Sequence, residues 1–100
     1  MRHPNSIHVR TYLESAFPGW SLRDGERVPR DSYWFTVEKI QTQETHRALV
    51  AREFLDDVPS DQIETMLGAW RVAEEMRQAG QDFVLVSTAG AKGRIRRNDL

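Results

Sequence analysis

Three histidines are the first side chains in this sequence to consider as metal ligands. His3 and His8 are five residues apart, and His46 is distant from both. Histidines that bind one zinc ion from the same helix stand three or four residues apart, and the chain has no cysteine to complete a set of ligands. We therefore predict no metal site, and we expect the three histidines to face solvent.

A cluster of aspartates, Asp56, Asp57 and Asp61, is the second candidate for cation binding. A calcium loop has alternating ligands, a glycine at its sixth position and an acidic residue at its twelfth, which counted from Asp56 is Leu67 here. Carboxylates at the start of a helix instead interact favourably with the unpaired N–H groups of its first turn. The cluster therefore predicts helix capping, in which Asp61 and Glu64 have the spacing of a capping box.

Nucleophile and phosphate-binding motifs are missing from the sequence as well. No serine lies in a Gly-x-Ser-x-Gly turn, and Gly90-Ala91-Lys92-Gly93 leads into no apolar-periodic helix whose first turn would bind phosphate. Without cysteine, the chain has no thiol nucleophile and no disulfide. We predict that the protein has no catalytic residues and no cofactor, and that it is not an enzyme.

The composition indicates one small soluble domain. The chain has 100 residues, of which 39% are hydrophobic and 29% are charged, and this is enough apolar material for a single core. No apolar run approaches the roughly 20 residues that span a bilayer, and the first residues lack the apolar core of a signal peptide. We expect an unprocessed cytoplasmic protein that does not enter a membrane. A domain this small also gains stability from self-association, so a homodimer is one expected arrangement.

Two helices are predicted from apolar residues that recur with the helical period. The first spans residues 5–17 and ends at Pro18-Gly19, because proline cannot donate the next helical hydrogen bond. The second spans residues 60–80 and carries Trp70 on its apolar face, where we expect it to pack in the core.

Strands are predicted from alternating or continuous apolar residues. Asp24-Gly25 predicts a tight turn after the first strand, and a loop follows over residues 27–31. The second and third strands predict an antiparallel hairpin, and the fourth is an apolar run that belongs inside the sheet. The four strands span residues 20–23, 32–40, 45–54 and 83–86.

Together these elements predict an α+β fold in the order α-β-β-β-α-β. Both helices are expected on one face of a small, mainly antiparallel four-stranded sheet. Residues 1–88 form the single domain. Residues 89–100 are expected to be a flexible basic tail, because they contain two glycines and little apolar surface.

This order is similar to that of the restriction-endonuclease-like nucleases, which use a Glu-x-Lys motif on a strand to hold metal and activate water. Here Glu38 and Lys39 are adjacent and point to opposite sides of their strand, and Glu53 has no lysine two residues later. Without its last strand, the order also resembles that of double-stranded-RNA-binding domains. Asp61 and Glu64 lie where those domains need lysines, so neither activity is predicted.

The open face of the predicted sheet is the first candidate binding surface. If Tyr33, Phe35 and Val37 face the helices, then Trp34 lies on the opposite face of the same strand. Tryptophan is a frequent hot-spot residue at protein interfaces, and aromatic rings on a sheet also stack nucleic-acid bases. The candidate partner-binding residues are Trp34, Thr36, Arg47 and Arg52.

The basic tail is the second candidate binding surface. The formal net charge is −1, but the balance is +2 over residues 1–30, −6 over residues 31–75 and +3 over residues 76–100. Cations on a flexible end contact phosphates without reading sequence. The candidate nucleic-acid-binding residues are Lys92, Arg94, Arg96 and Arg97.

These observations favour a non-catalytic protein-binding or adaptor domain that acts through the open sheet face. Its ligand is expected to be a partner protein or a second copy of the chain. The alternative is a nucleic-acid-binding accessory protein that uses the basic tail. A small enzyme ranks third, because the spacing of the residues singles out no matched acid and base.

Overall fold

The structure, a computed structural model, describes residues 3–27 and 31–99. Leu100 and part of the predicted loop over residues 27–31 lie outside the described residues. The fold is α+β, as predicted. The elements run in the order α1 (Ser6–Ala16), β1 (Ser21–Arg27), β2 (Ser32–Lys39), β3 (Glu44–Ala51), α2 (Arg52–Asp57), η1 (Ser60–Gln62), α3 (Ile63–Ala69), α4 (Val72–Gln78), β4 (Phe83–Ser87), β5 (Gly90–Ile95) and η2 (Arg97–Asp99), where η marks a 3₁₀ helix.

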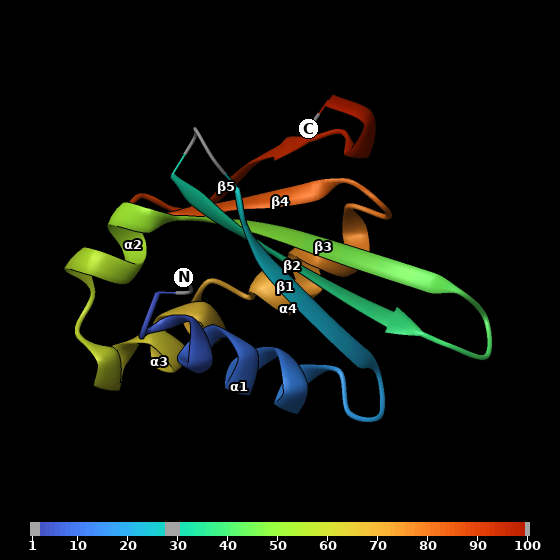
Figure 1. Ribbon diagram of the computed structural model, residues 1–100, viewed down its shortest axis with the longest axis horizontal. Coiled ribbons are helices and arrows are strands. Elements are labelled where there is room, and N and C mark those ends of the chain that lie inside the picture. Colours follow the sequence, from blue (N-terminus) through green and yellow to red (C-terminus); the bar gives the residue numbers. More distant parts are fainter. Residues whose placement is uncertain (1–2, 28–30, 100) are drawn as a thin grey trace.

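A five-stranded sheet in the order β1-β2-β3-β4-β5 runs through the molecule (Figure 1). β2 and β3 pair antiparallel, from Ser32 opposite Ala51 to Lys39 opposite Glu44, which confirms the predicted hairpin. β1 and β5 also pair antiparallel with their neighbours, whereas β3 and β4 are parallel. A parallel pair needs a long crossover connection, and here that connection contains α2, α3 and α4.

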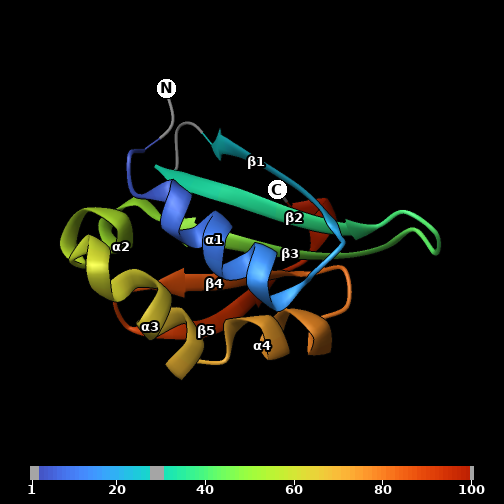
Figure 2. The same cartoon turned by 90° about the horizontal axis from the view of Figure 1, so that it is seen from below.

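The helices α1, α3 and α4 lie against one face of the sheet (Figure 2). Strand residues on that face pack against these helices, and α1, α3 and α4 leave the opposite face uncovered (Figure 2). In residues 3–27 and 31–99, no helix is long and apolar enough to span a bilayer. Among the described residues, the largest fully buried side chains of the core are Leu13, Phe17, Phe35, Phe54, Leu55, Ile63, Leu67 and Met76.

The predicted flexible tail is wrong through residue 99. Residues 90–95 form β5, which pairs antiparallel with β4, and η2 follows it. The apolar run of β4 needs a hydrogen-bonded neighbour on each side, and β5 supplies the second one. This confirms the interior position predicted for β4 and makes the sheet five-stranded instead of four-stranded. Gly90 and Gly93 have φ values of 118° and 90°, which glycine adopts without strain. The two glycines therefore allow the irregular register between β4 and β5 and do not make the segment mobile.

Two strand boundaries also differ from the prediction. Gly25 lies inside β1 and makes no turn, because the indole of Trp34 on β2 covers it. A Cβ atom at Gly25 would lie 2.6 Å from three atoms of that ring. The predicted strand over residues 45–54 ends at Ala51, since α2 begins there and turns Phe54 into the core.

The predicted second helix is broken into α3 and α4. Arg71 has a φ of 53°, in the left-handed region, and it redirects the chain between the two helices. The break lets Trp70 pack edge-on against Phe54, with ring centroids 5.6 Å apart, and it turns Val72 and Met76 into the core. Core packing therefore overrides the helical period, although a non-glycine residue in this region costs about 1–2 kcal/mol.

Candidate functional site

Trp34 lies on the open face of the sheet, near the middle of β2. Its neighbours Tyr33 and Phe35 are buried toward the helices, as the alternation along a strand requires. Across the sheet it stands opposite Gly25 on β1 and Leu49 on β3. Because Gly25 has no side chain, the indole packs closely against the backbone of β1, and this contact fixes the position of the ring on the open face.

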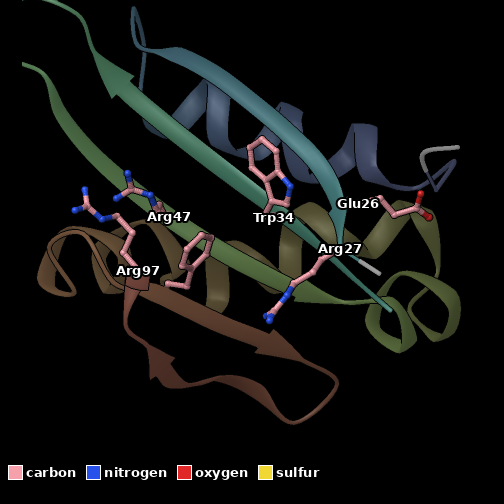
Figure 3. A pocket seen from close by; sticks show the side chains of 6 residues that line it. Glu26, Arg27, Trp34, Arg47 and Arg97 are labelled. Atoms are coloured by element: carbon pink, nitrogen blue, oxygen red, sulfur yellow. The ribbon is translucent and has the colours of Figure 1, made fainter. Parts of the chain in front are cut away.

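Three arginines surround Trp34 in a shallow hollow of about 370 Å³, which we call the arginine hollow. Figure 3 shows Arg47 and Arg97 on one side of Trp34 and Arg27 on the other. Phe83 of β4 and Glu26 of β1 complete the lining. The hollow thus combines an aromatic floor with guanidinium groups from β1, β3 and η2.

Two oxygen atoms of one residue, Gln81, hold two of these arginines together. Arg47 donates from Nη1 to the backbone oxygen of Gln81 at 3.1 Å, and Arg97 donates to the side-chain Oε1 of the same residue at 2.8 Å. Burial, followed by the positive charges of Arg97 and Arg23, lowers the pKa of Arg47, while Glu38 opposes this effect. The guanidinium remains charged near neutral pH, so a positive cluster is built into this face.

A second, mostly apolar hollow of about 280 Å³ lies on the same face, and we call it the apolar hollow. A pair of strand residues forms the junction between the two linings, because Arg27 of β1 lines the first hollow and Ser32 of β2, directly opposite it, lines the second. The apolar hollow is lined by Ser32, Leu49, Ala51, Leu85, Val86, Ser87, Lys92 and Ile95.

Two buried polar atoms at this junction have no hydrogen-bond partner within the described residues. They are Nη1 of Arg27 and Oγ of Ser32. Ser32 is only 6% exposed, so its hydroxyl has been removed from water without a compensating bond. Such atoms are rare in folded proteins and each one calls for an explanation.

The structure separates the four residues predicted for the open face. Trp34 and Arg47 both line the arginine hollow. Thr36 stands directly opposite Arg47 but lines neither of the two hollows. Arg52 lies at the start of α2, where it donates to Asp31 at 3.4 Å, and this hydrogen bond raises the pKa of Arg52. Arg52 lines neither of the two hollows described above.

The four basic residues predicted for the tail do not act as one flexible group. Arg97 lines the arginine hollow, and Lys92 lines the apolar hollow. Arg94 points elsewhere and pairs with Glu75 of α4 at 3.5 Å. Arg96 is exposed after the end of β5. The two candidate surfaces of the sequence analysis therefore contribute to one face.

Sequence reasoning missed Arg27, Ser32 and Phe83. The predicted turn at Asp24-Gly25 hid the fact that residues 23, 25 and 27 alternate onto the face that carries Trp34. That alternation is the signal that would have identified Arg27. No comparable signal was available for Ser32, because its burial depends on strands that are distant in the sequence.

The histidines and aspartates contribute to structure in ways that differ from the predictions. His46 is buried, at 4% exposure, because its ring joins β3 to the end of α4. Asp61 caps no helix through its side chain, and Asp56 contacts His3 at 2.6 Å instead. In the described part of the chain, no three His, Cys, Asp or Glu side chains are arranged to hold a metal ion.

No protein-family model matches the sequence, and searches of curated proteins and of solved structures found no match. The geometry of the open face is therefore the basis for assigning a function.

Proposed function

We propose that this chain is a non-catalytic protein-binding domain whose open sheet face accepts an acidic segment of a partner protein. The observation that carries the proposal is the arginine hollow, in which Arg27, Arg47 and Arg97 surround Trp34. The face is accessible because the helices lie on the other side of the sheet (Figure 2).

The residue types in this hollow are those that contribute most to protein interfaces. Tryptophan and arginine are enriched among hot-spot residues, whereas lysine is depleted at interfaces. An arginine guanidinium forms paired hydrogen bonds with a carboxylate, and it stacks on aromatic rings. A segment rich in aspartate and glutamate would supply the complementary charge.

Single-stranded nucleic acid is the second candidate, because Arg97 brings the basic C-terminal segment beside an aromatic ring. Proteins that bind single strands combine stacked bases with cations along the backbone. The arginine hollow is lined by three guanidinium groups, however, which are few for a phosphate backbone that crosses the whole face. A short acidic segment of a protein needs fewer cations, so we favour the protein partner.

Titration of the ¹⁵N-labelled protein with three probes tests the proposal. The probes are an acetylated hexapeptide of alternating Glu and Asp, an acetylated hexalysine and oligothymidylate of ten nucleotides. We expect the acidic peptide to shift the indole N–H signal of Trp34 and the Nε–H signals of Arg27, Arg47 and Arg97. Binding of oligothymidylate without binding of the acidic peptide would contradict the proposal and support binding of single-stranded nucleic acid instead.

Paired variants locate the binding surface. The double variant Arg47→Gln with Arg97→Gln should weaken the acidic peptide about tenfold or more, since each lost charge-assisted bond is worth about 1.5–3 kcal/mol. The double variant Arg52→Gln with Arg94→Gln removes the same charge outside the hollow and should leave the affinity unchanged. Equal losses in both variants would mean that the interaction is unspecific and would contradict the proposal.

Self-association is tested on the same material. Sedimentation of the free protein should show a monomer, whose open face is available to a partner. A dimer that the substitution Trp34→Ala dissociates would assign the face to a second copy of the chain and would overturn the acidic-partner proposal.

A further inference from the structure

Folding has left two hydrogen-bond donors without partners in the described residues, one on each of two paired strand residues of the open face. Nη1 of Arg27 and Oγ of Ser32 are both buried there. A buried polar group without a partner costs about 1–3 kcal/mol relative to its hydrated state, and more if it is charged. A ligand that offers oxygen atoms to these donors would recover part of that cost.

The two donors lie side by side on the same face. Arg27 and Ser32 are direct partners in the register of β1 and β2, so their side chains project from adjacent strands in the same direction. One lines the arginine hollow and the other lines the apolar hollow. An oxyanion at their junction would therefore be reached by both donors, with one hollow on each side.

The charge in the arginine hollow exceeds that of one carboxylate. Its lining contains three guanidinium groups, whereas the carboxylate of Glu26 projects from the other face of the sheet, where it accepts a hydrogen bond from the hydroxyl of Tyr33 at 3.4 Å. A phosphoryl group on a side chain carries about −1.5 to −2 at neutral pH and has three acceptor oxygens. An aspartate or glutamate carries a single negative charge on two oxygens. The excess charge and the number of donors both match the phosphoryl group better.

We propose that the partner segment carries a phosphorylated side chain whose phosphoryl oxygens accept hydrogen bonds from Arg27 and Ser32. Arg47 and Arg97 then neutralise the rest of its charge, and the apolar hollow accepts an aliphatic neighbour of the phosphorylated residue. This inference rests on the proposed function, because it specifies the acidic group that the open face recognises.

Three peptides that differ at one position test the inference. Their sequence is acetyl-Asp-Leu-X-Leu-Asp-amide, where X is serine, glutamate or phosphoserine, and affinity is measured by titration calorimetry. We expect the phosphoserine peptide to bind about tenfold or more tightly than the glutamate peptide. Equal affinity of these two would overturn the phosphate inference and leave the proposed function standing. If neither binds, the proposed function fails together with the inference.

Two serines of the apolar hollow provide a matched pair of variants. Ser32→Ala removes the hydroxyl without a partner, whereas Ser87→Ala removes one that accepts a hydrogen bond from the amide of Ala89 at 3.2 Å. We expect Ser32→Ala to weaken the phosphoserine peptide several-fold without lowering the melting temperature of the free protein. Ser87→Ala should leave that affinity unchanged. A lower melting temperature for Ser32→Ala would show that the hydroxyl has a structural partner and would overturn the inference.

The substitution Arg27→Lys keeps the charge but removes the planar fork of the guanidinium. We expect it to reduce the preference for phosphoserine over glutamate, since lysine acts only as a point charge. An unchanged preference in Arg27→Lys would also count against the inference, because Arg27 would then contribute only its charge.

Discussion

Replacing His46 with phenylalanine keeps a ring between Phe17 and Trp20 but removes the hydrogen bonds of the imidazole. His46 stacks on Phe17 with centroids 6.0 Å apart and contacts Trp20 at 5.6 Å. Its Nδ1 lies 2.9 Å from the oxygen of Met76 and 3.0 Å from that of Gly80, while Nε2 lies 2.6 Å from a carboxylate oxygen of Glu44. The substitution therefore isolates the polar contribution of this side chain.

The expected loss follows from which acceptors can regain water. Glu44 and Gly80 are exposed and can be hydrated in the variant, whereas the oxygen of Met76 lies in the core. One orphaned buried acceptor costs about 1–3 kcal/mol, so we expect His46→Phe to lower the free energy of unfolding by about 2 kcal/mol. For a domain of this size that corresponds to a decrease of about 8–16 °C in melting temperature. His46→Ala should cost about 2 kcal/mol more, because it also leaves a cavity between the two aromatic rings.

Urea unfolding at pH 7, followed by circular dichroism, measures these losses. His8→Phe is the control, since His8 is partly exposed on α1 and makes only a 3.7 Å contact with Glu64. It should change the free energy of unfolding by less than about 0.5 kcal/mol. If His46→Phe is as stable as the control, the bonds between the ring and the end of α4 contribute nothing, and the reasoning is wrong.

Three further substitutions test other parts of the structure. Tyr12→Phe removes the acceptor of an amide N–H at the start of α4, a 3.0 Å bond, and should cost about 1–2 kcal/mol in urea unfolding at pH 7. Burial raises the pKa of Tyr12 above its usual value of 10.0, so its contribution is present below pH 10 and lost as the pH rises further; unfolding between pH 9 and 12 should show a smaller alkaline decline in Tyr12→Phe. Gly25→Ala should displace the indole of Trp34, which an added Cβ would approach to 2.6 Å, and a shifted indole N–H signal with weaker binding of the acidic peptide is expected. Arg10→Gln should cost about 1–3 kcal/mol, because the carboxylate of Asp24 is only 4% exposed and would lose a 2.7 Å ion pair; an unchanged urea midpoint would contradict this.

The parts of the fold with a local cause were predictable from the sequence. Tyr33, Phe35 and Val37 are every second residue of β2 and are buried against the helices, so Trp34 between them lies on the open face. The polar turn after β2 predicted the hairpin with β3. These features depend on the period of one segment and its nearest neighbour in the chain.

The features that were missed depend on contacts between distant segments. Gly25 alone predicts a turn, and only its contact with the ring of Trp34 explains why it lies in a strand. Gly90 and Gly93 alone predict a mobile segment, and only their pairing with β4 shows that they belong to a strand. The left-handed conformation of Arg71 likewise has no local signal, because it is selected by the packing of the helices on either side. Arg27 was missed for this reason, and Arg97, which was predicted as part of a basic tail, joins Trp34 only after β5 is in place.

The position of Arg97 beyond an edge strand has a consequence for the dynamics of the open face. Among the described strands β5 pairs only with β4, and only one of its residues, Gly90, is buried. Segments with few buried contacts are among the first to open in local unfolding. Each opening of β5 would withdraw Arg97 and Lys92 from the two hollows while the remaining strands stay paired. A ligand held by these side chains would oppose the opening, so amide hydrogen exchange in β5 is expected to slow on binding more than exchange in β2 or β3.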